Sequence, residues 1–320
     1  MQRLRLLLLP LIALFALGGF ASTASAAKSS ITIGIGDQST KMFASSDYKA
    51  LGLKKTRYFF PWNGMDDQFT QDRAREFVDE AKAQGVSVLF HLSTDDFTAR
   101  KAKLPSVSAY KAQLKKIVAF FGPRGVHEWG VWNEANHVSQ PTYKNPVRAA
   151  DFYKAMYAAV PKGDNIVALD VLDQGGVDGY IKKFYGRLSS TYRKRAKIVG
   201  IHNYGDVNRN RSTYTSKMIS ATRKYNRSAK FWFTETGGLV EFKTTKTVFK
   251  CDTKRAASRT KSVFSLATKY KSQGVQRVYL YNWTGAGCGK TRFDAGLTDP
   301  DGTVRPAYNT VKALLSKYSR

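Results

Sequence analysis

Two kinds of apolar pattern alternate along most of this chain. Short runs rich in β-branched and aromatic residues predict strands, and longer stretches with apolar residues every three or four positions predict amphipathic helices. Strands are expected at residues 31–35, 56–60, 86–91, 128–132, 166–171, 197–202, 230–234 and 275–281. Helices are expected at residues 71–84, 109–121, 146–160, 177–188, 212–225, 258–272 and 306–318.

This alternation predicts a parallel sheet with right-handed crossovers, and eight such units close on themselves. We therefore expect an α/β fold, a single-domain (β/α)8 TIM barrel. An open, doubly wound sheet is the alternative. It is disfavoured because polar residues follow the strands all along the chain rather than gathering at one switch point.

The first 27 residues follow a different pattern. Residues 1–5 are basic, residues 6–20 are almost wholly apolar, and residues 21–27 are small and polar. The apolar run of about 15 residues is too short for a comfortable membrane span, and Ala24-Ser25-Ala26 offers an A-x-A cleavage site. We expect a signal peptide at residues 1–27, a secreted or cell-wall-associated protein, and one catalytic domain at residues 28–320. An uncleaved anchor is the alternative, and no later segment is apolar enough to span a membrane.

The composition is strongly basic, with 52 Lys and Arg against 24 Asp and Glu and a net charge of +28. Such a surface attracts anions, which outside a cell include teichoic acids, acidic polysaccharides, phospholipid headgroups and stray nucleic acid. A solvated basic exterior that only maintains solubility is the alternative. Net charge alone would support a nucleic-acid partner, and export argues against one, so no specific nucleic acid is expected. We expect a monomer.

The chain has two cysteines, Cys251 and Cys288. In an exported protein they predict a disulfide. They follow the seventh and eighth expected strands, which are neighbours in a closed barrel. Two free buried thiols are the alternative. Four histidines without a Cys-x-x-Cys or His-x-x-x-His pattern give no case for a metal, and no cofactor is expected.

Two glutamates stand at the ends of strands. Glu134 follows the fourth strand in Trp-Asn-Glu-Ala-Asn, and Glu235 follows the seventh in Phe-Thr-Glu-Thr-Gly-Gly. In a barrel, the carboxyl ends of all strands converge on one pocket. Two carboxyl groups there suit hydrolysis of a glycosidic bond, in which one protonates the leaving oxygen and the other attacks or activates water.

Other polar and aromatic residues occupy the remaining strand ends. They are Arg57 in the second strand, His91 in the third, Asn133 after the fourth, Asp170 and Asp173 at the fifth, His202 and Tyr204 at the sixth, and Trp283 after the eighth. This set resembles glycoside hydrolase clan A, broadly of the family 39 and family 5 type, whose barrels hydrolyse glycosides with retention of configuration. The resemblance covers essentially the whole mature chain. It rests on Asn133-Glu134, Glu235, Arg57, His202-Asn203-Tyr204 and Trp283. Ala135 departs from it, because proline is common there.

The resemblance implies roles for these residues. Glu134 would be the general acid and then the general base, which requires a raised pKa, and Glu235 would be the nucleophile. Tyr204 would hydrogen-bond Glu235, and Asn133 would hold the 2-hydroxyl of the sugar. A retaining enzyme needs its carboxyl groups about 5–5.5 Å apart. Because strict alternation would point Asn133 and Glu134 to opposite faces, the strand must end or bulge there.

Several of these residues have a structural alternative. Arg57 fits a support of the charged nucleophile or a structural ion pair. His91 fits a packed residue or a sugar contact, and His202 an orienting residue. Asp170 and Asp173 fit loop braces or substrate ligands. Trp283 is expected to stack on sugar, whereas strand parity places Trp232 opposite Glu235 and therefore outward.

The sequence thus predicts a secreted retaining glycoside hydrolase that cleaves a β-linked polysaccharide or oligosaccharide by double displacement with two glutamates. The alternative is a non-catalytic secreted barrel that binds anionic cell-wall polysaccharide. The sugar, and whether cleavage is exo or endo, depend on loops. The long insert at residues 241–259 is expected to form one wall of the groove.

Overall fold

The computed structural model describes residues 29–96, 102–245 and 248–320. The predicted signal peptide at residues 1–27 lies outside the described residues. No helix within the described ranges combines the length and the apolar character needed to cross a bilayer.

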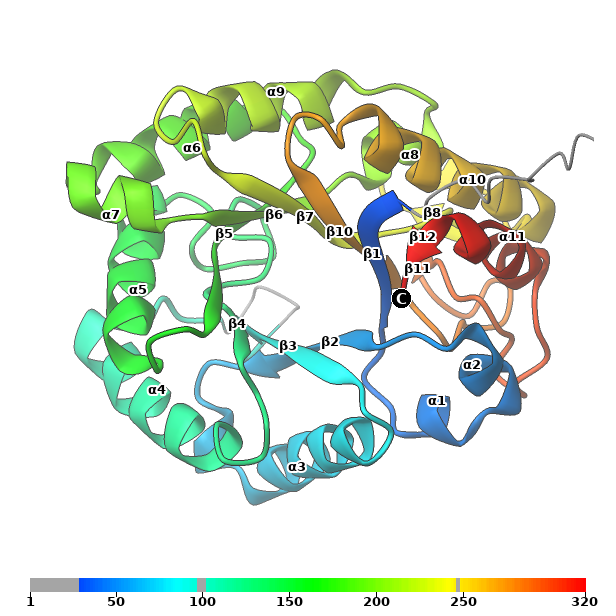
Figure 1. Ribbon diagram of the computed structural model, residues 1–320, viewed down its shortest axis with the longest axis horizontal. Coiled ribbons are helices and arrows are strands. Elements are labelled where there is room, and N and C mark those ends of the chain that lie inside the picture. The colour runs from blue at the N-terminus through cyan, green and yellow to red at the C-terminus, as the bar shows by residue number, and fades with distance from the viewer. Residues whose placement is uncertain (1–28, 97–101, 246–247) are drawn as a thin grey trace, which may run out of the picture.

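Eight parallel strands form a closed barrel, with helices around the outside (Figure 1). Neighbouring strands pair in chain order, and the eighth pairs with the first, Ile35 lying opposite Leu280. This closure confirms the (β/α)8 prediction and excludes the open sheet. The strands are β1 (Ser29–Gly36), β2 (Lys55–Pro61), β3 (Ser87–Ser93), β4 (Glu128–Gly130), β5 (Asn165–Leu172), β6 (Ile198–His202), β7 (Lys230–Thr236) and β10 (Val275–Tyr281). A short strand, β12 (Tyr318–Ser319), adds to the start of β1.

The seven predicted helices are present. They are α3 (Gln68–Ala83), α4 (Val107–Phe121), α5 (Pro146–Ala159), α6 (Val177–Gly186), α9 (Thr213–Arg223), α10 (Thr253–Lys269) and α11 (Pro306–Leu314). Their starts follow capping chemistry, since the side chains of Asp67, Ser106 and Asp252 each accept a hydrogen bond from a backbone N–H in the first turn.

Four short helices lie outside the predicted set. They are α1 (Lys41–Ala44), α2 (Ser46–Leu51), α7 (Ser190–Arg195) and α8 (Tyr204–Asn208). The 3-10 turns η1 (Gly64–Asp66) and η2 (Leu315–Lys317) complete the helical segments of the described chain. Helices α1 and α2 occupy the first crossover, for which the sequence pattern predicted no helix.

The barrel encloses a small core of its own. Its buried residues are Leu89, Val167, Ile198, Trp232 and Tyr279, from five different strands. Below them, Glu128 accepts hydrogen bonds from Lys55 (3.0 Å) and Arg277 (2.5 Å), which reach it from other strands of the barrel. These contacts fill the interior of the barrel beneath the strand ends that carry the predicted site residues.

The prediction that Trp232 points outward is wrong, because β7 does not alternate regularly. Gly200 of β6 pairs with Trp232, but His202 pairs with Glu235, so two residues of β6 span three of β7. This register shift is a bulge, which changes the side to which the next side chain points. Trp232 and Glu235 therefore both face the barrel interior, at different depths.

Candidate active site

A pocket of about 490 Å³ opens at the carboxyl end of the barrel. This volume lies in the range of small-ligand sites. The side chains that line it come mainly from β2, β7, β10 and the segments after β4, β5 and β6. They include Phe59, Asn133, Glu134, His137, Leu172, Asp173, Tyr204, Arg209, Glu235 and Tyr281. The strand ends that the sequence identified therefore meet in one place.

Arg57 organises one side of this pocket. Its buried guanidinium donates to Glu235 Oε2 (2.7 Å), Asn133 Oδ1 (2.5 Å) and His91 Nδ1 (3.2 Å). Burial lowers the pKa of His91 to about 3, so its imidazole is neutral and can accept this bond. One cation thus holds three of the predicted residues in fixed positions. A purely structural ion pair would need only one of these contacts, so the arrangement favours the supporting role expected for Arg57.

Glu235 is supported at both oxygens. Arg57 bonds one of them, and Tyr204 Oη donates to the other, Oε1, at 3.0 Å. Hydrogen bonds and an opposite charge favour the ionised form of a carboxyl group. The hydrogen bond expected between Tyr204 and Glu235 is confirmed, and the arrangement suits a group that must remain a carboxylate.

Glu134 reaches the pocket because β4 ends early. The strand stops at Gly130, two residues before the predicted end, so its alternation no longer applies to the Asn-Glu pair. Glu134 has a left-handed backbone with φ of 44°. Non-glycine residues adopt this conformation at a cost and tend to do so at functional sites. The early end and the turn together allow Asn133 and Glu134 to line the same pocket.

Asp170 of β5 fixes this turn. Its Oδ1 accepts a hydrogen bond from the backbone N–H of Glu134 at 2.9 Å, and its backbone carbonyl accepts one from Ala135 at 2.9 Å. Its other carboxylate oxygen accepts from Thr234, the neighbour of Glu235. A Cβ on Gly200 would collide with this carboxylate, so glycine is required at that point of β6. Asp170 is thus a brace, one of its two expected roles.

His202 lies between the acidic residues. Its Nδ1 is 3.0 Å from Glu134 Oε1 and 3.8 Å from Glu235 Oε2, and its Nε2 is 3.0 Å from Asp170 Oδ1. Burial would lower the pKa of His202, but the charges of Asp170 and Glu235 and the hydrogen bond with Glu134 raise it to about 10. The surrounding acidic residues therefore favour the protonated form of this buried imidazole.

The expected rise in the pKa of Glu134 does not occur in this resting site. Burial would raise it, but the hydrogen bond and charge of His202, together with the charge of His137, outweigh burial and lower it. The expectation is wrong because it considered the carboxyl group without its neighbour. Any proton that Glu134 donates must therefore be supplied through the site rather than stored on Glu134.

The two glutamates are close together. Glu134, His202 and Glu235 each place one ligand-type atom within 4.8 Å of the others, so the nearer carboxylate oxygens are separated by no more than that. This fits the short spacing of a retaining glycosidase and leaves little room for an intervening water. Three such atoms could also surround a cation. In this structure His202 Nδ1 lies within hydrogen-bond distance of Glu134 Oε1, at 3.0 Å, which is the arrangement of an acid–base pair.

Asp173 braces the segment after β6. Its carboxylate accepts hydrogen bonds from the backbone N–H groups of Gly205 (3.0 Å) and Asp206 (2.6 Å) in α8. Burial raises the pKa of Asp173 to about 8 despite these bonds. Because α8 carries Tyr204 at its start, this contact supports the position of that side chain.

The structure places Trp283 and His91 outside the pocket. The prediction that Trp283 stacks on sugar is wrong, because its side chain is buried outside the pocket and packs edge-on against Tyr48 and Tyr308. Tyr281, two residues earlier at the end of the same strand, lines the pocket instead. His91 is fully buried and acts on the pocket only through Arg57, which fits a supporting role.

A small antiparallel sheet forms one wall of the pocket. It consists of β8 (Glu241–Lys243), β9 (Val248–Phe249) and β11 (Phe293–Asp294), and its Phe242, Phe249 and Phe293 face the cavity. The insert at residues 241–259 thus contributes to a wall, as expected. These phenylalanines could not be predicted from the sequence, since nothing in a short apolar segment indicates that it lines a cavity.

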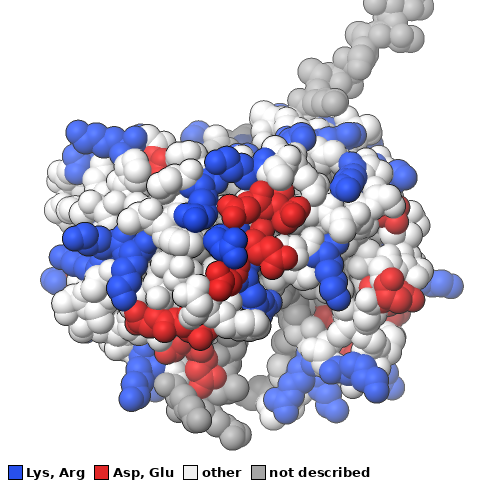
Figure 2. All heavy atoms as spheres, turned by 90° about the horizontal axis from the view of Figure 1, so that it is seen from below, with Lys and Arg blue, Asp and Glu red and all other residues white. Residues whose placement is uncertain are grey.

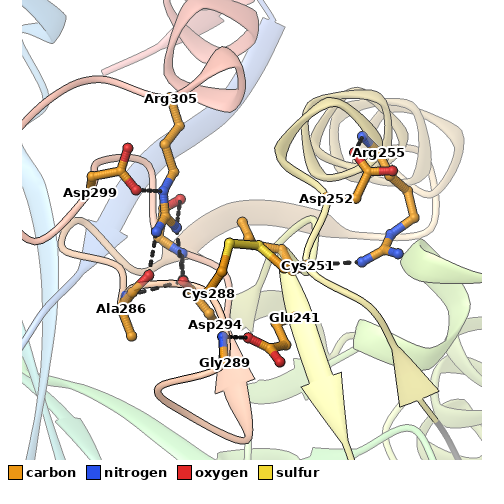
Figure 3. The surroundings of a disulfide bond; sticks show 12 residues. Glu241, Cys251, Asp252, Arg255, Ala286, Cys288, Gly289, Asp294, Asp299 and Arg305 are labelled. Atoms are coloured by element: carbon orange, nitrogen blue, oxygen red, sulfur yellow. Dashed lines mark hydrogen bonds and ion pairs between the residues drawn. A yellow bond between two sulfur atoms is a disulfide. The ribbon is translucent and has the colours of Figure 1, made fainter.

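A disulfide fastens this wall, as predicted. Cys251 follows β9, and Cys288 lies in the loop between β10 and β11 (Figure 3). The same loop is held by Arg305, which donates to Asp294 Oδ1 (2.9 Å), Asp299 Oδ1 (2.8 Å) and the carbonyl of Ala286 (2.6 Å). The pocket wall is therefore connected to the barrel by both covalent and ionic contacts.

Comparison with known proteins identifies the fold. No family model and no curated protein matches the sequence. A family 39 glycoside hydrolase from the gut symbiont Bacteroides cellulosilyticus WH2 matches with a TM-score of 0.63 at 16% identity, over 89% of this chain and 63% of that one. The exo-β-1,4-mannosidase Op5Man5 from Opitutaceae bacterium strain TAV5 matches with a TM-score of 0.63 at 13% identity, over 89% of this chain and 59% of that one.

A third solved structure matches along nearly its whole length. A psychrophilic family 10 endo-β-1,4-xylanase has a TM-score of 0.62 at 16% identity, over 88% of this chain and 96% of its own. The chain therefore spans less than two thirds of the first two neighbours and almost all of the xylanase. The similar structures are TIM-barrel glycoside hydrolases of the kind that the sequence resembled.

Proposed function

We propose that this protein is a retaining glycoside hydrolase that cleaves a β-linked polysaccharide or oligosaccharide. The observation that carries the proposal is the close pair of carboxylates, Glu134 and Glu235, at the carboxyl end of the barrel. Their partners differ, because Glu235 is bonded by Arg57 and Tyr204 and Glu134 by His202. Such a difference assigns the two carboxyl groups to different steps.

In the first step, a carboxylate oxygen of Glu235 attacks the anomeric carbon and forms a glycosyl ester. The bond from that carbon to the leaving oxygen breaks with its electron pair, and the leaving oxygen takes a proton from Glu134. We propose that this proton rests on His202 Nδ1 and crosses the 3.0 Å hydrogen bond to Glu134 as the bond breaks. Neutralising Glu235 in the ester removes one of the charges that hold the proton on His202.

In the second step, Glu134 is again a carboxylate, removes a proton from water and returns it to His202 Nδ1 across the same hydrogen bond, which restores the resting protonation of both groups. The water oxygen attacks the anomeric carbon, and Glu235 leaves as a carboxylate bonded by Arg57 and Tyr204. Asn133 is oriented by Arg57, which occupies its Oδ1. Its NH2 group is therefore presented as the donor to a sugar hydroxyl.

The first experiment is to measure reducing-end release from β-glucans, xylan, mannan, arabinan, galactan and acidic bacterial exopolysaccharides. Glu235→Ala and Glu134→Ala should each reduce release by about 10³-fold, the scale of losing an acid–base or covalent step. Glu80→Ala, which removes an exposed glutamate on α3, is the matched control and should retain activity. Azide should restore turnover to the two active-site variants with opposite anomeric products, because it replaces the nucleophile in one and the activated water in the other.

The alternative is a barrel that only binds. It would be supported if no polymer were cleaved while one of them bound equally well to the wild type and to Glu235→Ala. Inversion of configuration in the first product would instead rule out double displacement.

We also propose that the protein is exported, on the signal-like pattern of residues 1–27. Sequencing the amino terminus of protein recovered from the culture medium tests this. A start near Ala27 is expected, and an intact Met1 would contradict it.

A further inference from the structure

A second, larger cleft of about 1110 Å³ lies at the opposite end of the barrel. Its lining comes from the amino ends of β1, β5, β6, β7 and β10 and the loops that lead into them. The candidate active site lies at the carboxyl ends of the same strands. The two cavities therefore lie at opposite ends of the same barrel, and a molecule bound in one does not block the other.

This cleft is strongly basic. Its lining contains Lys162, Arg195, Lys197, Lys230 and Arg277, against the single acid Asp164. Asp164 is already engaged, with one oxygen accepting from Trp129 Nε1 at 2.7 Å and the other 3.1 Å from His127 Nδ1. Arg277 is likewise paired with Glu128.

The other four cations of the cleft are not neutralised. Within the described ranges, no carboxylate oxygen lies within 4.0 Å of Lys162, Arg195, Lys197 or Lys230. Lys162 lies in the loop before β5, Arg195 ends α7, Lys197 comes just before β6, and Lys230 begins β7, so the four cations converge from separate segments. Cations gathered in a concave site focus the field and attract an anionic ligand.

The positive charge of the protein is not spread evenly. Figure 2 shows the side of the barrel covered by α3, where Asp and Glu side chains gather in the middle and Lys and Arg surround them. Helix α3 alone carries Asp72, Glu76, Asp79 and Glu80. On that side, basic side chains have acidic neighbours that offset their charge. In the described part of the chain, the four cations of the amino-end cleft have no such neighbours, so an external anion is attracted more strongly to the cleft.

The rest of the lining favours sugars over nucleic acid. Ser30, Thr32, Asn165 and Gln276 present hydroxyl and amide groups, which pair with sugar hydroxyls. Single-stranded nucleic acid would need exposed aromatic faces on which bases stack. Two aromatic residues line the cleft: Trp232 is almost fully buried and covered by the Arg277 guanidinium at 3.8 Å, and Tyr157 is half-buried with the Arg195 guanidinium 5.0 Å from its ring centroid.

We propose that this cleft binds a segment of acidic polysaccharide, a chain of sugars that carry carboxylates, at a site separate from the candidate active site. The cations hold the carboxylates and the neutral polar side chains hold the hydroxyls. Such a site would keep the protein on an acidic polymer while the pocket at the other end stays open. The inference does not depend on the pocket being catalytic.

The test uses an oligogalacturonate of about eight sugars as the probe, with titration calorimetry on the mature protein at low and high salt. Lys197→Glu/Lys230→Glu should weaken binding by about tenfold at low salt, because two attractive charges become repulsive. Lys111→Glu/Lys115→Glu on α4 changes the net charge equally at exposed positions away from the cleft, and should change affinity less than about twofold. Lys162→Glu provides an independent single change in the cleft.

Three results would overturn the proposal. The first is that the wild type does not bind the probe. The second is that the cleft variant and the α4 variant lose the same affinity. The third is that a duplex DNA of similar charge binds as tightly as the probe and loses the same affinity in the cleft variant. Melting temperatures of all variants show whether they are folded. Cleavage of a neutral substrate should be unchanged in the cleft variant, so failure here and failure of the proposed activity can be told apart.

Discussion

At the scale of single residues, His202 decides how the site holds its charge. Three acidic residues surround it, and its own proton offsets part of their repulsion. Two carboxylates held within 4.8 Å repel each other. The histidine lies beside both carboxylates and keeps a proton within hydrogen-bond distance of Glu134.

This arrangement predicts a particular dependence of stability on pH. A pKa raised from 6.5 to about 10 in the folded state contributes stability that is complete below pH 6.5 and is lost as pH rises through about 10. The melting temperature of the wild type should therefore fall across this window. In His202→Gln that part of the fall should disappear, with a lower melting temperature at neutral pH.

The control is His127→Gln, which changes a largely exposed histidine and should retain the alkaline slope. Cleavage by the wild type should also decline on the alkaline side, because His202 then has no proton to pass to Glu134. An identical pH profile in His202→Gln would contradict the assignment of the proton.

At the scale of elements, local backbone departures decide which side chains face the pocket. The early end of β4 and the bulge in β7 are responsible for bringing Glu134 and Glu235 together. Both glutamates could be picked out from the sequence, because each follows an apolar run. Strict strand alternation could not predict which way their side chains point, because it allows for neither the early end nor the bulge. The bulge is also why alternation wrongly placed Trp232 outward.

Other features could not be predicted because they depend on contacts between distant segments. Tyr281 and Trp283 end the same strand, and only the packing of α2 and α11 against Trp283 shows that Tyr281 is the one in the pocket. The lowered pKa of Glu134 likewise comes from a histidine 68 positions away. The motifs and the order of the strands can be predicted from the sequence. The pKa of a site residue cannot, because it depends on neighbours that only the folded chain brings together.

The disulfide-fastened wall, formed by β8, β9 and β11, gives a prediction at this scale. The bridge closes a loop of 37 residues, for which chain entropy predicts a stabilisation of about 3–4 kcal/mol. Cys251→Ser/Cys288→Ser should lower the free energy of unfolding by about that amount. Because Phe242, Phe249 and Phe293 line the pocket, KM should rise more than kcat falls.

Denaturant unfolding and initial-rate kinetics check both parts. A reductant should lower the stability of the wild type towards that of the variant and leave the variant unchanged. If KM were unaffected while stability fell, the wall would be structural and would not form part of the substrate site.

At the scale of the whole molecule, the barrel separates two surfaces. The fold itself was predictable, because eight alternating units leave few other arrangements. The amino-end cleft was not, since its cations come from segments far apart in the sequence and form a group only after the barrel closes. The basic composition left open both an anionic partner and a surface that only maintains solubility, and in the described structure four cations of this cleft have no carboxylate within 4.0 Å.

The surface also predicts the state of association. Among the described residues, five large hydrophobic side chains are exposed, and they are scattered over α3, the β4–α5 connection, α5 and β9: Phe69, Val138, Tyr143, Val147 and Val248. A stable interface usually needs a contiguous apolar centre. We expect a monomer by light scattering coupled to size exclusion. Because a net charge of +28 would by itself keep copies apart at low salt, the measurement should be repeated at about 1 M salt, where repulsion is screened. A monomer under both conditions would show that the surface lacks a self-complementary patch, whereas a dimer that forms only at high salt would show that charge alone had kept the copies apart.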